Sequence, residues 1–261
     1  MTSYEDQSLK DYPIEELVNE EELKQFLDVF SPKTEPLNYL KSQRLIKQEN
    51  GNSSPIVAAT LLYSQNPSAI IPKKCAIKIS RYETSEKIPL REHLKIQHTI
   101  EGPVKRQIDT SVECIQKIIE SMKILGDTGL VPPKYPKEAI KEIIVNAVIH
   151  RDYNISDDIL VMIFDNRIEV KSPGKLPGHI TLKNILDERF ARNSKIVRLI
   201  NKYPNPPNKD IGEGLNTAFQ KMKEMRLKDP YIEETEHAVI VTLPHQTLAS
   251  PDEIVLDYLK K

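Results

Sequence analysis

Glycine, cysteine and tryptophan are scarce or absent in this sequence. Of its 261 residues, 8 are glycine, 2 are cysteine and none is tryptophan. The two cysteines, Cys75 and Cys114, lie far apart and have apolar neighbours, which excludes a paired metal-binding spacing and favours buried free thiols over a disulfide. Because glycines are few, each loop that contains one is worth placing individually.

A net charge and long apolar runs are also lacking. Lys and Arg together number 37 and Asp and Glu 38, for a net charge of −1, so the total gives no support to a nucleic-acid partner. No signal peptide is recognisable, and no apolar run approaches the roughly 18 residues of a membrane span. With 39% hydrophobic and 29% charged residues, the composition is that of a soluble protein with a core, and we expect it in the cytoplasm, away from membranes.

The hydrophobic pattern predicts an α/β protein in which helices and strands alternate. Residues 1–20 are acidic and polar and are expected to be a poorly anchored lead-in. Residues 56–62 fit either a buried strand or a buried helix, and their alanines and the following Asn66-Pro67 favour the helix. The other predicted helices cover residues 20–30, 37–45, 108–125, 136–151, a short stretch after 180, one from 192 and one from 215 to about 227; the predicted strands cover residues 75–82, 94–100, 159–164, 168–171, 231–234 and 238–243.

Three polar residues stand out in the predicted helix over 136–151. Glu142, Asn146 and His150 are spaced four apart, so they lie on one face of the helix. The residues between them are almost all apolar, and burying a carboxylate or a carboxamide without a partner is costly. A surface stripe or a buried hydrogen-bonded pair would account for them, and so would a nucleotide with its metal ion and an attacking water.

Two glycine-containing loops are candidate anion or ligand contacts. Gly212-x-Gly214-Leu215 precedes a predicted helix, where glycines let backbone N–H groups approach an anion and the helix N-terminus favours negative charge. Ser172-Pro-Gly174 follows the predicted hairpin. Alone, each is a weak signal, because an ordinary helix-initiating turn or a proline turn also has this composition.

The order of these motifs resembles the GHKL (Bergerat-fold) class of ATPases, which includes histidine kinases, DNA gyrase and heat-shock chaperones. That class has a Glu-x-x-x-Asn helix, a strand hairpin with a glycine loop, a lid, and a Gly-x-Gly-Leu helix start. A closer resemblance is to its divergent RecG-related or Schlafen AlbA-associated branch, and it covers about residues 20–245. The residues that carry it are Glu142-Ile-Ile-Val-Asn146-Ala-Val-Ile-His150-Arg151-Asp152-Tyr153, Phe164-Asp165-Asn-Arg167-Ile168-Glu169-Val170, Pro173-Gly174-Lys-Leu176-Pro177 and Arg192-Asn193.

The resemblance implies a two-layer α/β sandwich of the GHKL type with a smaller α/β unit before it. Residues 1–53 would be a helical lead-in, 54–107 the small α/β unit, 108–245 the ATP-binding domain, and 246–261 the start of a truncated winged-helix-like segment. A Gly-x-x-x-x-Gly-Lys-Ser/Thr loop is missing, so the helicase name given to some relatives gains no support.

For the phosphate half of an ATP site, the resemblance implies that Asn146 coordinates Mg²⁺ and that Glu142 polarises the water attacking the γ-phosphate. Gly212, Gly214 and Leu215 would form the phosphate-binding start of a helix.

For the other half, Gly174 would let its loop close over the adenine, and Arg192 with Asn193 would belong to a mobile lid. Ser172 stands where the class has the aspartate that accepts a hydrogen bond from the adenine amine, and a serine accepts less strongly. Arg151 is expected near the phosphates or in a salt bridge with Asp152 or Glu169, whereas His150 has no assigned role.

The function implied is an ATP-binding and ATP-hydrolysing regulatory module, dependent on Mg²⁺, that switches an attached or partner nucleic-acid-binding domain. Two alternatives stay open: a nucleotide sensor without useful hydrolysis, and a DNA-binding transcription regulator in which the ATPase core is a scaffold. Nucleic acid is expected only through a flanking domain or partner chain that the sequence lacks, and a homodimer is expected by analogy with the class.

Overall fold

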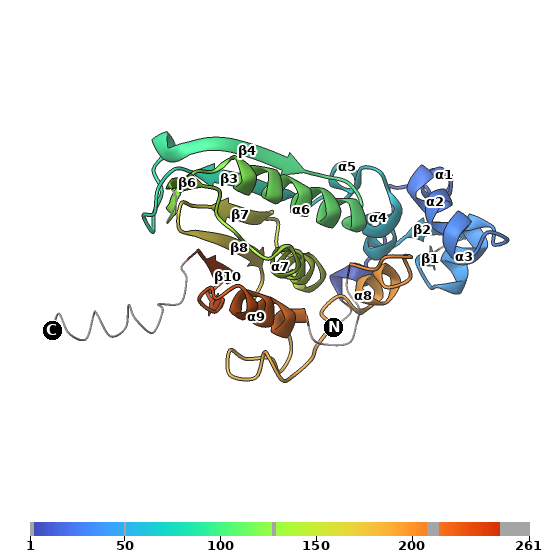
Figure 1. The fold of residues 1–261 in the computed structure, drawn as a ribbon. Coiled ribbons are helices and arrows are strands. Elements are labelled where there is room, and N and C mark those ends of the chain that lie inside the picture. Colours follow the sequence, from blue (N-terminus) through green and yellow to red (C-terminus); the bar gives the residue numbers. More distant parts are fainter. Residues whose placement is uncertain (1–2, 50, 127–128, 208–213, 246–261) are drawn as a thin grey trace.

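The structure is a computed structural model that describes residues 3–49, 51–126, 129–207 and 214–245 (Figure 1). Its amino-terminal part contains the short helix η1 (Tyr4–Asp6), helices α1 (Ile14–Asn19), α2 (Glu21–Phe30) and α3 (Pro36–Ser42), the hairpin strands β1 (Ile46–Glu49) and β2 (Asn52–Pro55), and helices α4 (Val57–Tyr63) and α5 (Pro67–Ile70). Within these described ranges, no helix is long and apolar enough to cross a membrane.

The rest of the chain builds a sheet and the helices that cover it. Its elements are β3 (Ile77–Tyr82), η2 (Arg91–His93), β4 (Leu94–Ile100), α6 (Val104–Ser121), β5 (Ile124–Gly126), β6 (Gly129–Val131), α7 (Lys137–His150), β7 (Ile159–Ile163), β8 (Arg167–Pro173), α8 (Ser194–Ile200), α9 (Gly214–Glu224), β9 (Tyr231–Glu234) and β10 (Ala238–Pro244). This confirms the predicted α/β class.

Six strands form one mixed sheet in the order β4-β3-β7-β8-β10-β9. The pairing of β3 with β7 is parallel, and the other neighbours are antiparallel. Since β3 and β4 come from residues 54–107 and the other four strands from residues 108–245, the two predicted units contribute to the same sheet.

Helices α6, α7 and α9 lie on one side of this sheet and pack side by side (Figure 1). In α6 the apolar residues recur at helical spacing, and its Val104, Ile108 and Ile115 are fully buried. Residues that alternate along β3 and β7, such as Ile77, Ile79 and Val161, are buried as well. The apolar core therefore lies between this helical layer and the sheet.

The prediction of a poorly anchored lead-in is wrong. Glu5 is only 1% exposed, and its carboxylate accepts hydrogen bonds from the backbone N–H groups of Lys195 (3.1 Å) and Ile196 (3.2 Å) at the start of α8. These groups have no partner inside the helix, so a carboxylate there satisfies them and suits the positive end of the helix. Burial raises the pKa of Glu5, and the two backbone hydrogen bonds oppose that shift.

Two further element predictions need correction. The helix predicted over 108–125 runs from Val104 to Ser121, and Ile124–Gly126 is a strand. The short helix predicted after residue 180 does not form. Instead, the Asn184 side-chain oxygen accepts hydrogen bonds from the Thr181 N–H (2.6 Å) and hydroxyl (3.0 Å), which fixes a turn in competition with helical hydrogen bonds.

Other predictions are confirmed. The ambiguous segment 56–62 forms helix α4, and α8 begins at Ser194, next to the predicted start. The strands over 231–234 and 238–243 and the hairpin before them are present. The segment predicted to resemble the start of a winged helix, residues 246–261, lies outside the described residues.

Candidate functional site

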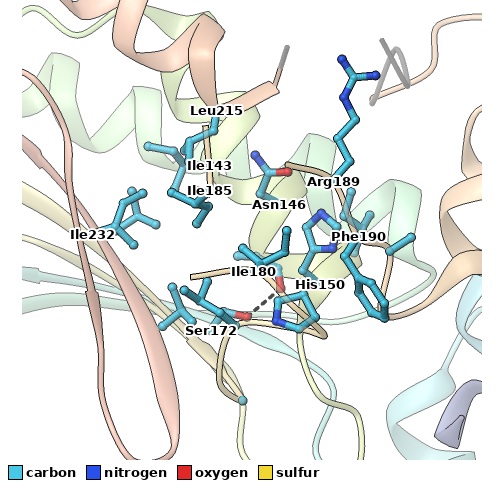
Figure 2. A pocket seen from close by; sticks show the side chains of 18 of the residues that line it. Ile143, Asn146, His150, Ser172, Ile180, Ile185, Arg189, Phe190, Leu215 and Ile232 are labelled. Carbon is cyan, nitrogen blue, oxygen red and sulfur yellow. Dashed lines mark hydrogen bonds between the residues drawn. The ribbon is translucent and has the colours of Figure 1, made fainter. Parts of the chain in front are cut away.

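A cavity of about 240 Å³ opens between α7, the sheet and the loop that follows β8 (Figure 2). Its first wall is α7 together with the ends of β8, β10 and β9. The second wall is the segment of residues 174–193, which has no helix or strand. The start of α9 closes one end. The lining is mainly apolar, with a few polar or charged groups from α7, β8 and the second wall, which is the usual make-up of a small-molecule site.

The polar stripe of α7 faces this cavity. Glu142, Asn146 and His150 all line it, while the residues between them, such as Ile144 and Val145, are buried in the core. The Asn146 amide donates a hydrogen bond to the Glu142 carboxylate over 3.3 Å. Burial raises the pKa of Glu142, and the hydrogen bond from Asn146 lowers it in part. The stripe is therefore an open wall of a pocket rather than a solvent-exposed face.

The sheet side of the cavity is apolar except at one position. The side chains on this face come from alternate residues of β8 and β10 and from the edge strand β9; they are Val170, Ser172, Val239, Val241 and Ile232. The Ser172 hydroxyl donates a hydrogen bond to the carbonyl of Ala147 on α7 over 2.8 Å. Because that bond uses the single hydroxyl proton, the Ser172 oxygen offers only acceptor lone pairs to a ligand.

His150 lies at the carboxyl-terminal end of the α7 stripe. Its Nδ1 is buried and has no hydrogen-bond partner among the described residues. Burial, and then the nearby charge of Arg192, lower the pKa of His150 to about 4. The imidazole is therefore neutral at pH 7.

Gly174 marks the point where the chain leaves β8 for the second wall. Its φ is +105°, and a Cβ there would lie 2.7 Å from the Asp152 Cβ and 2.8 Å from Arg192 Nη1. The Arg192 guanidinium pairs with the Asp152 carboxylate (2.9 Å) and also donates to the Lys175 carbonyl. Gly174 thus allows three segments to meet at one crossing, and it lines the cavity beside them.

Asn193 and Arg151 lie behind the cavity and do not line it. The Asn193 amide donates to the carbonyls of Ile149 (2.9 Å) and Arg151 (3.0 Å), where α7 ends. The binding roles predicted for these two residues, and the lid role for Arg192, stay predictions. Asn193 joins the end of α7 to the segment that precedes α8, and Arg151 joins it to the backbone at Lys74 and Asp157.

Arg151 is 1% exposed and donates to the carbonyls of Lys74 (2.9 Å) and Asp157 (2.6 Å). The alternative prediction, a salt bridge from Arg151 to Asp152 or Glu169, is wrong. Those carboxylates pair with Arg192 (2.9 Å) and Arg167 (2.5 Å). Backbone carbonyls hold Arg151, one of them 77 residues away at Lys74 and the other six residues away at Asp157.

The start of α9 supplies the remaining end of the cavity. Gly214 is its first residue, Leu215 and Asn216 line the cavity, and α9 packs along α7. Figure 2 shows Leu215 beside Ile143 of α7. The predicted contact residue Gly212 lies outside the described residues.

The second wall contributes cavity-lining residues that were not predicted from the sequence. Lys175, Arg189 and Phe190 line the cavity, as do the apolar Ile180 and Ile185 (Figure 2). Their spacing follows neither a helical nor a strand period, because the segment has no regular structure. The one available signal was their place between two recognised motifs, Pro173-Gly174 and Arg192-Asn193.

In the part of the chain that the structure describes, no group of three or more His, Cys, Asp or Glu side chains could hold a metal ion. The predicted Mg²⁺ would therefore have few protein ligands. Asn146 and Glu142 offer a carboxamide and a carboxylate oxygen, which suit this ion, and Mg²⁺ in proteins usually keeps several waters and binds substrate phosphates. The donor set thus fits an ion that comes with a phosphate ligand.

A comparison with known families matches the part of the chain that forms one side of the cavity. Residues 156–243 match a family described as "putative ATP-dependent DNA helicase recG C-terminal". The match includes the sheet side of the cavity and its second wall but begins after α7. No curated protein sequence matches this chain.

Among solved structures, the DIP2311 protein from Corynebacterium diphtheriae has a similar fold, with a TM-score of 0.62 and 21% sequence identity. The similarity covers 91% of this chain and 46% of the other, so this chain spans about half of that protein's length. It shows the fold alone. Together, the comparisons give an α/β fold that contains an ATPase-like domain over residues 156–243.

Proposed function

We propose that this chain is an ATP-binding module that hydrolyses ATP with Mg²⁺ and uses the nucleotide state to regulate a partner. The observation that carries the proposal is the half-buried, hydrogen-bonded pair of Glu142 and Asn146 on the wall of a largely apolar cavity. An ATPase-like family match over the opposite side of the same cavity supports it. A hydrogen-bonded pair with a purely structural role would not need to line a cavity.

The phosphates would lie at the start of α9. Backbone N–H groups of the first turn of a helix are unpaired and favour an anion, and Gly214 has no side chain to hinder its approach. Asn146 and Glu142 face the same end of the cavity from α7. An Mg²⁺ ion held by Asn146 and the phosphates would supply neutralisation of the charge on the phosphate oxygens.

Glu142 would act as the general base toward the attacking water. A base is most effective when its pKa approaches the working pH, and burial raises the pKa of Glu142 in that direction. The hydrogen bond from Asn146 fixes the carboxylate on the cavity side of the helix.

The base would occupy the apolar sheet side, where Val170 and Val241 offer flat apolar contact and Ser172 the polar one. Because the Ser172 oxygen can only accept, it fits a ligand donor such as the 6-amino group of adenine and disfavours the 6-oxo group of guanine.

Calorimetry with ATP and ADP, with and without Mg²⁺, together with a phosphate-release assay, tests the proposal. We expect ATP to bind more tightly with Mg²⁺ present and phosphate to be released slowly. Glu142→Gln should keep binding and lower the hydrolysis rate about 10²-fold or more, as loss of a general base does. Unchanged turnover in Glu142→Gln would rule out Glu142 as the base, and failure of all nucleotides to bind would overturn the proposal as a whole.

A second candidate is a nucleotide sensor without hydrolysis, and Ser172 is the observation that favours it. A neutral hydroxyl holds the adenine amine less strongly than a carboxylate does, so the nucleotide would be held less firmly. Binding of ATP and ADP without phosphate release would favour this function over the first.

The regulated partner would be a nucleic-acid-binding domain or chain, since the matching family is described from a DNA helicase. Binding of DNA by this chain alone, with an affinity that falls steeply as salt rises, would favour a DNA-binding regulator instead. With a net charge of −1, we expect no such binding by the isolated chain.

A further inference from the structure

His150 is a polar group of the cavity that the proposed function leaves unused. Its ring lies between Asn146 and Phe190 (Figure 2), and it makes no hydrogen bond or ion pair within the described residues. A polar side chain that lines a cavity and has no protein partner is available to a ligand. Nδ1 is fully buried, so Nε2 is the nitrogen that reaches the ligand space.

The position of His150 along α7 separates it from the phosphate end. Leu215, at the start of α9, lies beside Ile143, and His150 is seven residues further along the helix. At a rise of about 1.5 Å per residue, this places His150 about 10 Å beyond Ile143 along the helix axis. It also lies in the last turn of α7, where the helix dipole disfavours anions. His150 therefore lies away from the proposed phosphate end of the cavity.

The surroundings of the imidazole keep it in the neutral form. The charged groups around it are Glu142 on its own helix, Asp152 and Arg192 at the crossing behind it, and Lys175, Glu188 and Arg189 on the second wall. Of these, Arg192 is the one that lowers the pKa of His150, in addition to burial. A neutral imidazole has one donor and one acceptor nitrogen, so Nε2 can serve a hydroxyl in either direction.

The base and sugar of a nucleotide would contact two surfaces of the cavity, the sheet side and the surface toward the second wall. Ser172 and its apolar neighbours form the surface for a flat base on the sheet side. His150 and Phe190 lie across from that surface, toward the second wall (Figure 2). The sugar is the part of a nucleotide that is joined to the base and carries neutral hydroxyl groups.

We propose that His150 hydrogen-bonds a ribose hydroxyl of the bound nucleotide and thereby makes the site selective for ribonucleotides. This assignment rests on the proposed function, because it takes the cavity to be the nucleotide site. Its test must therefore compare nucleotides with each other, not activity alone.

Calorimetry with ADP, 2′-deoxy-ADP, 3′-deoxy-ADP and pyrophosphate separates the sugar from the phosphates. The wild-type protein should bind ADP about tenfold more tightly than one of the two deoxy analogues, the value of one hydrogen bond in a buried site. His150→Ala should bind ADP about tenfold more weakly, show no preference between ADP and that analogue, and bind pyrophosphate as the wild type does.

Two further variants serve as controls. His150→Gln keeps a group that donates and accepts, and it should restore part of the preference for ADP even if His150→Ala folds poorly. His98→Ala removes an exposed histidine of the edge strand β4 and should change no affinity.

The contrary outcomes are distinct. An equal loss of affinity for ADP and for both deoxy analogues in His150→Ala would overturn the sugar contact, and so would a loss for pyrophosphate. Nucleotide binding that is unchanged in His150→Ala would overturn this assignment and leave the proposed function standing. No binding of any nucleotide by the wild-type protein would overturn both.

Discussion

The two walls of the cavity are built in different ways. The first wall consists of α7 and paired strands, whose backbone groups are hydrogen-bonded and whose inner side chains are buried. The second wall, residues 174–193, has no helix or strand and exposes Leu182 (49%), Leu186 (37%) and Phe190 (43%). The difference shows that the first wall is the structural framework of the site. The polar groups to which the proposed chemistry is assigned sit on the wall that resists displacement, and the other wall adds apolar cover together with charged side chains such as Lys175 and Arg189.

The second wall is fixed mainly where it begins and ends. Gly174 and Arg192 meet at Asp152, and Asn193 joins the segment to the end of α7. Between these anchors, short turns such as that of Asn184 and Thr181 hold the chain. Changes at the anchors should therefore cost more stability than changes between them.

Among changes in the second wall, Gly174→Ala should have the largest effect. A Cβ at this position would lie 2.7 Å from the Asp152 Cβ, and the φ of +105° is unfavourable for alanine. We expect the free energy of unfolding to fall by about 2–4 kcal/mol, measured by urea denaturation. Gly51→Ala is the matched control, because Gly51 has a φ of +81° but no atom within 4 Å of its Cβ position. Equal losses in the two variants would show that the crossing of segments contributes nothing.

Asn193→Ala should come next. It removes two hydrogen bonds to the carbonyls of Ile149 and Arg151 in a place where Asn193 is 2% exposed. We expect a loss of about 1–3 kcal/mol in the free energy of unfolding, since buried carbonyls lose their donor. Asn184→Ala in the middle of the second wall should cost less. A larger loss for Asn184→Ala would reverse the comparison between the anchors and the segment between them.

Acid should weaken the first wall through His150. Its pKa is lowered from 6.5 to about 4 in the folded protein, so the unfolded chain takes up a proton first as the pH falls. The stability that this shift contributes is complete above pH 6.5 and is lost toward pH 4, with about 1 kcal/mol lost at pH 5.5.

The measurement is urea denaturation of the wild type and of His150→Gln at pH 7.5 and pH 5.5. The variant should lose less stability than the wild type between the two pH values. Glu5, whose pKa is raised, acts in the opposite direction in both proteins and cancels in this difference. Identical losses in both proteins would mean that His150 does not titrate differently in the folded state.

Phe190→Ala should have the smallest effect on stability. The ring is partly exposed on the second wall, so we expect less than about 1 kcal/mol in denaturation, and a few-fold loss of ADP affinity in calorimetry. Ile143→Ala on the first wall, where the side chain is fully buried, should cost about 2–5 kcal/mol. Similar losses in the two variants would show that the second wall is as firmly packed as the first.

The sequence predicted the first wall well, because its helix and strands have clear periods. Glu142, Asn146 and Ser172 were predicted as site residues and do line one cavity. The second wall could not be predicted, since its turns depend on side-chain hydrogen bonds such as that from Thr181 to Asn184. Predicted helical structure there was wrong for that reason.

Arg151 shows a second limit of predicting the site from the sequence. Its neighbours His150 and Asp152 are placed by the end of α7, but its own guanidinium reaches the carbonyl of Lys74, 77 residues away. Nothing local in the sequence separates a buried structural arginine from one that binds phosphate. The charge pattern alone therefore predicted carboxylate partners for Arg151, whereas its guanidinium donates to backbone carbonyls.

The contact of Glu5 with the start of α8 has a consequence for the order of assembly. The two ends of this contact are about 190 residues apart in the chain, as the separation between Glu5 and Ile196 shows. During synthesis, the carboxylate of Glu5 has none of its partners at the start of α8 until residues 194–196 have been made, although its own segment emerges first. We expect the sheet strands β3, β4, β7 and β8 to be available for pairing before this contact closes. The contact of Glu5 with α8 is thus among the last contacts of the amino-terminal segment to form, after its pairing with residues 55–57.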